Sequence, residues 1–180
     1  EINDYFSLKK FIVESAADTI YHLAANSDIK NSAISSEPDL QDTLMTTVNI
    51  ANVIRESRVK KLIFASSSAV YGQHELSISE DFPCRPESAY GWMKLASERV
   101  LLNLQQLGYV DKLLIARFPN VTGKFQTHGV VFDLINQLRD NPHHLKVLGD
   151  GTQLKPFLSA ENLSRTLIQI INLPWSGELQ

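Results

Sequence analysis

The stretch from Ala65 to Lys94 constrains the fold of this chain most, because it begins where a buried strand ends. The run Lys61–Phe64 before it has the length and β-branched character of a strand in a parallel sheet. Three serines, Ser66–Ser68, follow this run directly. Because ligands of open α/β sheets bind at the carboxyl ends of the strands, we expect the serines to lie at a binding edge.

The second half of this stretch predicts a helix with two functional groups on one face. Ser88 suits the N-cap position, and Gly108 is a stop signal. Tyr90 and Lys94 are four residues apart, so they share a face. Free tyrosine has a pKa near ~10, and an ammonium one turn away lowers it. With a serine hydroxyl opposite, this pair suits proton transfer from an alcohol that is being oxidised to a ketone.

Five sequence blocks resemble the extended short-chain dehydrogenase/reductase family, in its NAD-dependent sugar-nucleotide epimerase/dehydratase branch. The UDP-glucose 4-epimerases of that branch are the most similar, and the resemblance covers nearly the whole chain. The blocks, in the family's order, are Asp18–Ala25, Ser66–Gly72, Tyr90-x-x-x-Lys94, Arg117–Gly123 and Gly149–Gln153.

The resemblance implies specific roles for residues of this sequence. It implies a catalytic set of Ser67, Tyr90 and Lys94. It implies contacts with the NAD cofactor from Leu23, Ala24, Ala25, Ala65, Ser66, Tyr90, Lys94, Phe118 and Pro119. It implies contacts with a UDP-sugar substrate from Ser67, Tyr90, Asn120, Gly129, Val130 and Lys155.

The reaction that the resemblance implies is epimerisation of a UDP-glucose or UDP-galactose type substrate at C4 through a 4-keto intermediate. Tyr90 would take the proton of the C4 hydroxyl, Ser67 would hold that oxygen, and Lys94 would lower the pKa of Tyr90 and bind the nicotinamide ribose. Dehydratases of the family usually carry acidic residues where this chain has Ser68 and Ala69, which cannot shuttle a proton at neutral pH. A nucleotide-sugar reductase or oxidoreductase, or a non-catalytic binding module, are the alternatives.

Several features depart from the family pattern. The chain has no G-x-x-G-x-x-G turn for the pyrophosphate, so we expect an internal piece of a longer enzyme. Met45 stands where relatives have a bracing asparagine, and Asn49 lies one turn further along the helix. Lys155 stands where relatives often have arginine, so its grip on a diphosphate would be less directional.

The elements predicted along the chain give an α/β fold: a partial Rossmann-type parallel sheet with helices on both faces, plus part of a small substrate-binding lobe. We expect residues 1–124 to be the C-terminal portion of an NAD-binding domain and residues 125–180 to be part of the lobe. Strands are predicted at 18–25, 60–66, 112–118 and 157–160, and helices at 1–17, 38–57, after Ser88, 130–141 and 162–172.

Composition bounds the partners of the chain. A net charge of −3 and a pI near 6.0 give no electrostatic case for nucleic acid or an anionic membrane. No apolar stretch approaches the ~20 residues of a membrane span, and no signal peptide is evident, so a cytoplasmic protein is expected. Five scattered histidines lack ligand spacing, which predicts no metal site. Cys84 is the only cysteine of the sequence, so no internal disulfide can form. The family resemblance further implies that the full-length enzyme is a homodimer.

Overall fold

The computed structural model describes residues 2–26, 34–73, 78–147 and 149–179. The chain divides into two compact units, and each is described by itself. The first unit contains Glu1–Phe118 and Ile170–Gln180, and the second contains Pro119–Gln169. The sequence-based division at 124/125 gave the C-terminal residues to the lobe, whereas their contacts in the structure belong to the first unit.

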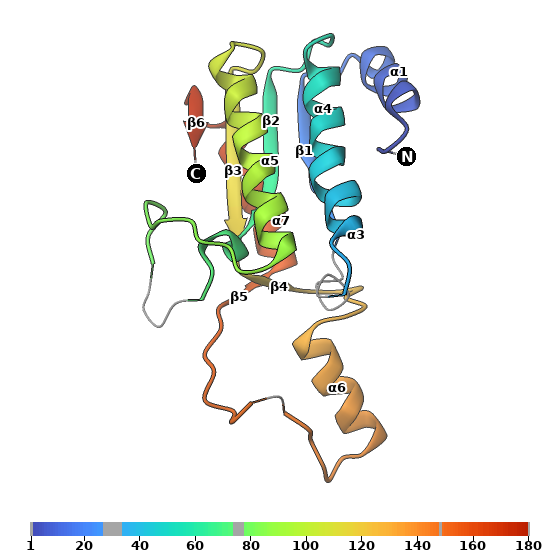
Figure 1. The fold of residues 1–180 in the computed structure, drawn as a ribbon, viewed down its shortest axis with the longest axis vertical. Coiled ribbons are helices and arrows are strands. Elements are labelled where there is room, and N and C mark those ends of the chain that lie inside the picture. The colour runs from blue at the N-terminus through green and yellow to red at the C-terminus, as the bar shows by residue number, and fades with distance from the viewer. Residues whose placement is uncertain (1, 27–33, 74–77, 148, 180) are drawn as a thin grey trace. The chain divides into compact units, whose positions relative to one another are not determined.

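A four-stranded parallel sheet forms the centre of the first unit (Figure 1). Its strands, in the order in which they are hydrogen-bonded, are β1 (Thr19–His22), β2 (Lys61–Ser67), β3 (Lys112–Phe118) and β6 (Gly177–Leu179). In the register of β2 and β3, Ser66 is opposite Arg117 and Ser67 is opposite Phe118. Because β1, β2 and β3 are parallel, their carboxyl ends meet at one edge of the sheet.

Two helical columns lie side by side on one face of this sheet (Figure 1). The first runs without a break through α3 (Glu37–Asp39), a π-helical segment (Leu40–Met45) and α4 (Thr46–Ile54). The second is α5 (Ala89–Gln106). A further helix, α1 (Tyr5–Ser15), packs against α4. The core between helices and sheet includes Ile50, Val53, Ile54, Leu62, Phe64, Leu101, Leu104, Leu113 and Ile115.

The opposite face of the sheet is also covered. Ile63 and Leu114 alternate with the core residues of their strands and are still 0% and 4% exposed. The last turn of α7 (Ala160–Asn172) contributes the buried Ile171 to this unit. Lys112 donates from Nζ to the carbonyls of Ile171 at 3.2 Å and Leu173 at 2.7 Å, which satisfies the helix end.

The second unit is built from two short parallel strands and helical segments. β4 (Asn120–Thr122) pairs with β5 (Phe157–Ser159). The helix α6 (Val130–Asp140) has no buried residue, although it is strongly amphipathic, and most of α7 follows β5. Gly123 fits closely here, since a Cβ on it would lie 2.7 Å from the Cβ of Ala160.

The predicted element types agree with the structure, whereas several boundaries do not. The strand predicted at 18–25 is limited to Thr19–His22, and the helix predicted at 38–57 begins at Glu37 and contains the π-helical segment. The strand at 112–118 is confirmed residue for residue. β4 was not predicted, because three residues give no usable periodicity. Residues 26–36 are polar and rich in Ser and Asn, which predicts a loop, and most of this segment lies outside the described residues.

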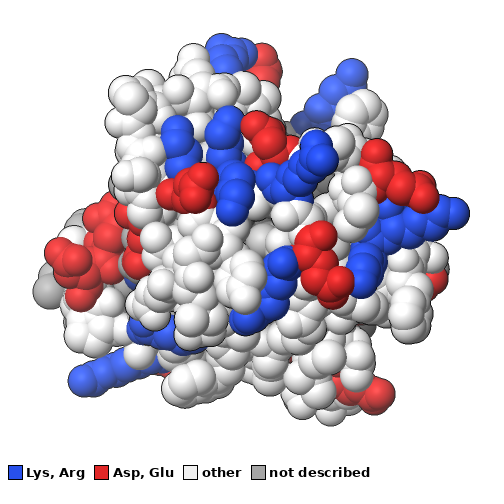
Figure 2. Space-filling model, turned by 90° about the horizontal axis from the view of Figure 1, so that it is seen from above, with Lys and Arg blue, Asp and Glu red and all other residues white. Residues whose placement is uncertain are grey.

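Charges of both signs are mixed on the surface in Figure 2, where Lys and Arg side chains alternate with Asp and Glu. Ion pairs of the first unit include Lys9–Glu56 at 2.5 Å and Lys61–Asp18 at 3.4 Å. Among the described helices, none is long and apolar enough to cross a membrane.

Two glycines with nearly equal positive φ angles give the first testable prediction. Gly72 has φ +79°, and a Cβ on it would lie 2.3 Å from the carbonyl oxygen of Arg85. Gly108 has φ +77°, with nothing within 4 Å of such a Cβ. Gly108→Ala should therefore cost about 1 kcal/mol of unfolding free energy from backbone strain alone. Gly72→Ala should cost more than about 2 kcal/mol, because overpacking is added to strain.

Urea denaturation of the two variants and the parent chain measures this difference. Equal losses of unfolding free energy in the two variants would show that the turn around Gly72 opens without cost.

Candidate active site

The serines after β2 turn directly into a short helix at the carboxyl edge of the sheet. Ser67 is the last residue of β2 and the N-cap of a 3₁₀ helix, Ser68–Tyr71. Its Oγ accepts a hydrogen bond from the backbone N–H of Ala69 at 3.2 Å. This local cap fixes the direction of the Ser67 side chain at the end of the strand.

The first turn of α5 is held against this 3₁₀ helix. Ser88 caps α5 as predicted, and its Oγ accepts from the N–H of Gly91 at 3.1 Å. Gly91 is buried, and a Cβ there would lie 2.7 Å from the carbonyl oxygen of Ala69. The absence of a side chain at Gly91 therefore lets the helix turn that carries Tyr90 approach the turn that follows Ser67.

The three predicted catalytic residues meet at this junction. The Ser67 side chain lies close enough to that of Tyr90 to lower its pKa. The Nζ of Lys94 lies 5.7 Å from the centroid of the Tyr90 ring. Lys94 is only 2% exposed and donates to the carbonyl oxygen of Ala65 at 2.6 Å. An alcohol bound against Ser67 and Tyr90 would thus face a hydroxyl, a phenol and a nearby ammonium.

Burial dominates the electrostatics of this junction. It raises the pKa of Tyr90, the Ser67 side chain lowers that pKa, and the charge of Asp39 raises it. Burial also lowers the pKa of Lys94 to about 8, although the negative charge of Glu98 acts to raise it. The net direction for Tyr90 is opposite to the lowering expected from Lys94. Desolvation disfavours the phenolate here more than its neighbours favour it.

A buried ion pair ties α5 to the strands beneath it. Glu98 is 0% exposed, and Arg117 on β3 donates to its two oxygens from Nε at 3.0 Å and Nη2 at 2.7 Å. Ser66 donates to the same carboxylate at 2.5 Å. Arg117 also donates from Nη1 to the hydroxyl of Tyr71 at 2.9 Å. The Ser66 hydroxyl is therefore engaged in the interior, which leaves its backbone for the predicted cofactor contact.

Three side chains in a row on the first helical column face the end of β1. Asp39 Oδ1 accepts from Asn26 Nδ2 at 2.8 Å, and Thr43 Oγ1 accepts from the backbone N–H of Asn26 at 3.1 Å. Thr47 Oγ1 is 2.9 Å from Nε2 of His22. The buried members of this group are His22, Asp39, Thr43 and Thr47. The predicted cofactor contacts Leu23, Ala24 and Ala25 lie between His22 and Asn26 and are exposed or half-exposed.

The tautomer of His22 follows from these contacts. The Thr47 hydroxyl donates to the carbonyl of Thr43 at 2.9 Å, so Nε2 of His22 must be the donor to Thr47. Nδ1 is then unprotonated, and it has no hydrogen-bond partner among the described residues. A proton added there would be buried without an acceptor. Burial accordingly lowers the pKa of His22 to about 4, and the charge of Lys94 adds to this effect.

The remaining predicted residues lie at or beyond the end of β3. Phe118 ends that strand, and Pro119 opens the second unit. Within the second unit, Asn120 donates to the carbonyl of Pro156 at 3.4 Å. Gly129 has φ +101° before α6, Val130 is 50% exposed, and Lys155 is exposed. The grouping of these substrate residues with Ser67 and Tyr90 stays a prediction.

In the structure, the segment after β1 is held by Asp39 and Thr43, and not by Met45 or Asn49, the two positions considered from the sequence. Met45 is 37% exposed, and Asn49 donates to the carbonyl of Ile2 at 3.1 Å, toward the N-terminal segment. Asp39, Thr43, Glu98 and Arg117 were all missed as site residues. The available signal was Arg117, a charged residue that directly follows the apolar run Leu113–Ala116 within one strand.

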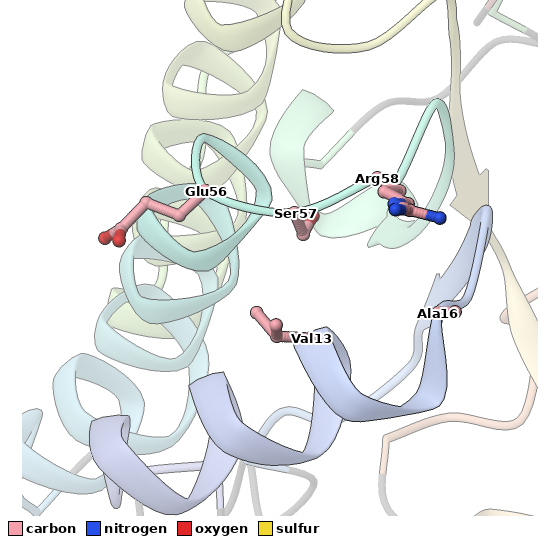
Figure 3. Close-up of a pocket in the computed structure, with 5 residues that line it drawn as sticks. All are labelled: Val13, Ala16, Glu56, Ser57 and Arg58. Atoms are coloured by element: carbon pink, nitrogen blue, oxygen red, sulfur yellow. The ribbon is translucent and has the colours of Figure 1, made fainter.

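A hollow of about 370 Å³ lies away from this junction (Figure 3). Val13 and Ala16 line it from the end of α1, and Glu56, Ser57 and Arg58 line it from the connection between α4 and β2. It contains none of the predicted site residues. In the described ranges, no three His, Cys, Asp or Glu side chains gather as metal ligands.

Comparison with known proteins decides the family. The sequence profile of the NAD dependent epimerase/dehydratase family matches residues 1–179. The chain belongs to this family. A UDP-glucose 4-epimerase of Lactobacillus helveticus is 27% identical over 154 residues, which are 84% of this chain and 46% of the relative. The chain spans about half the length of the curated relatives that it matches.

Solved structures of epimerase-family proteins share the fold. MoeE5, solved in complex with UDP-glucuronic acid and NAD, is 28% identical with a TM-score of 0.88, over 99% of this chain and 59% of that one. The UDP-glucuronic acid 4-epimerase of Bacillus cereus, solved with UDP-glucuronic acid and NAD, is 25% identical with a TM-score of 0.87, over 99% and 56%. The Rossmann-like fold and the family predicted from the sequence are thus confirmed.

The buried ion pair of this epimerase-family chain gives a second prediction. Arg117→Ala should lower the unfolding free energy by about 3–5 kcal/mol, because it leaves the Glu98 charge buried without its partner. Arg165→Ala is the matched control, since it breaks the exposed i,i+4 pair with Glu161. That loss should be about 0.5 kcal/mol or less. Chemical denaturation compares the two, and similar losses would contradict the structural role of Arg117.

The third prediction concerns the loss of unfolding free energy at acidic pH. The folded state keeps His22 neutral down to about pH 4, whereas the unfolded chain binds its proton near the usual pKa of 6.5. The unfolded state therefore binds more protons between these values, and folding weakens as pH falls through this window. The contribution is about 3 kcal/mol.

Unfolding free energies measured at several pH values test this. His22→Gln should flatten the loss between about pH 6.5 and pH 4, and the exposed substitution His143→Gln should leave it unchanged. An unchanged slope in His22→Gln would assign the acid sensitivity to other groups.

Proposed function

We propose that this chain carries the acid–base centre of an NAD-dependent sugar-nucleotide 4-epimerase that acts on a UDP-sugar. The observation that supports it most is the meeting of Ser67, Tyr90 and Lys94 at the carboxyl edge of a parallel sheet. The family of the chain and the names of its relatives point to the same chemistry. The first unit would supply part of the NAD-binding domain, and the second unit part of the substrate lobe.

The carboxyl edge of the first unit fits NAD. Leu23 exposes 57% of its surface just after β1, and Ala24 and Ala25 follow it with side chains small enough for a ligand to approach the backbone. When bound, the cofactor would supply hydride transfer to and from C4 of the sugar. The residues proposed to hold it are Leu23, Ala24, Ala25, Ala65, Ser66, Tyr90, Lys94, Phe118 and Pro119.

Tyr90 is the proposed general base and acid. It would take the proton of the C4 hydroxyl and return it to the same oxygen after the 4-keto sugar has turned over. Ser67 would bind that oxygen through the hydroxyl that now contacts Tyr90. Lys94 would donate to the nicotinamide ribose, and its lowered pKa, about 8, makes its charge sensitive to pH near neutrality.

The turn after Ser67 favours epimerisation over dehydration. Ser68 and Ala69 follow Ser67 in the 3₁₀ helix, and neither can serve as an acid or base at neutral pH. Elimination of water from the sugar needs such a pair. The Ser67–Tyr90 pair is sufficient for removal and return of the C4 proton.

The sugar itself is proposed from relatives. The Lactobacillus helveticus relative is named for UDP-glucose, and the Bacillus cereus structure holds UDP-glucuronic acid. We favour the UDP-glucose/UDP-galactose pair, with Asn120, Gly129, Val130 and Lys155 as the residues that contact the nucleotide side of the substrate. The full-length enzyme is proposed to be a cytoplasmic homodimer.

Turnover is the fourth prediction. The chain should interconvert UDP-glucose and UDP-galactose without net consumption of NADH. Tyr90→Phe should lower the rate by about 10²–10⁴-fold while the fold is retained, because the proton acceptor is lost. Tyr21→Phe, at an exposed position of β1, is the matched control and should keep the parent rate.

Release of NAD from the denatured protein is measured alongside the rate. Stoichiometric net oxidation or reduction of the cofactor would favour the reductase or oxidoreductase alternative. Absence of both bound NAD and turnover would favour the binding-module alternative for this chain.

A further inference from the structure

A carboxylate with no role in the proposed reaction is buried beside the site. Asp39 ends α3 and is 0% exposed. Its Oδ1 accepts the hydrogen bond from Asn26, and its Oδ2 has no hydrogen-bond partner among the described residues. Burying a carboxylate with one oxygen unsatisfied is costly, so a purely structural role is better filled by a neutral side chain.

The position of Asp39 brings it close to the helix that carries Tyr90. α3 and the π-helical segment after it both pack against α5. The two helical columns run side by side, and both begin at the edge where β1 and β2 end (Figure 1). Asp39 and Tyr90 each lie in the first turn of a column. In support of this proximity, the Asp39 charge is one of the causes that raise the pKa of Tyr90.

The other charged and titratable groups near Tyr90 are accounted for. Lys94 lies on the same helix and donates to Ala65, and the charge of Glu98 is paired with Arg117. His22 at the end of β1 is held neutral by its contact with Thr47 and by burial. On the helical column that packs against α5, Glu37 and Asp42 are exposed, and Asp42 is bonded to Asn3. Among the described residues, Asp39 is thus the buried acid near Tyr90 that has no cationic partner.

We propose that Asp39 is a positioning residue of the site, which anchors Asn26 after β1 and holds a negative charge against the turn that carries Tyr90. Burial and this charge both oppose formation of the phenolate, so the charge adds to the effect that keeps Tyr90 protonated until a bound cation offsets the carboxylate. Any phenolate that does form is a stronger base. The anchor holds the segment that contains Leu23, Ala24 and Ala25. The significance for catalysis rests on the proposed function, whereas the effect on Tyr90 does not.

The test is a spectroscopic titration of Tyr90 in the 180-residue chain. Phenolate absorbance is followed against pH, and the step that Tyr90→Phe removes is assigned to Tyr90 among the five tyrosines. Asp39→Asn removes the charge and keeps a hydrogen-bonding group for Asn26. Asp39→Ser removes the charge and is too short for that bond. Both should shift the Tyr90 step to lower pH, and only Asp39→Ser should also lower the melting temperature.

Asp42→Asn is the matched control, because it removes an exposed acid three residues further along the same column. It should leave the Tyr90 step at the parent pH. A Tyr90 step that does not move in Asp39→Asn and Asp39→Ser, or that moves equally in Asp42→Asn, would overturn the proposal. A step that moves as expected in a chain without turnover would support the role of Asp39 and count against the proposed function.

Discussion

The buried pair between Glu98 and Arg117 is the interaction on which the rest of the site depends. It joins the middle of α5 to β3, and Ser66 and Tyr71 connect the same pair to the end of β2 and the turn beyond it. A helix that packs on a sheet through apolar contacts alone can slide by small amounts. A bidentate charged pair has one geometry, so it fixes α5 against the strand ends and sets where Tyr90 and Lys94 lie.

The site is chemically distinctive because ionisable groups are withdrawn from water around it. Lys94, His22 and Asp39 are all nearly or fully buried, and among the described residues each side chain has one hydrogen-bond partner, which satisfies part of its capacity. The pKa values of Lys94, His22 and Tyr90 respond to neighbouring charges more strongly than those of surface groups would. A change of charge at one of them therefore changes the protonation of the others, which suits a reaction that moves one proton out and back.

The sequence predicted the parts of this arrangement that are local. The helix cap at Ser88, the strand Lys112–Phe118 and the spacing of Tyr90 and Lys94 follow from short-range rules, and the structure agrees with them. The direction of the Tyr90 pKa was wrong, because the expectation counted the lysine charge and omitted burial. The π-helical segment was also missed, since its hydrophobic pattern differs little from that of the α-helix on either side.

By itself, the sequence determined the fold class, the family and the identity of the groups that meet at the strand ends. The fold class follows from hydrophobic periodicity, whereas the family and the roles of those groups follow from the resemblance of five residue blocks to a known family. Only the tertiary structure decided that Ser66 bonds to Glu98, that Arg117 completes the pair and that Asp39 is buried near Tyr90. These contacts join residues far apart in the chain, and the free energy of burying a charge depends on what surrounds it in space, which spacing along the chain does not specify.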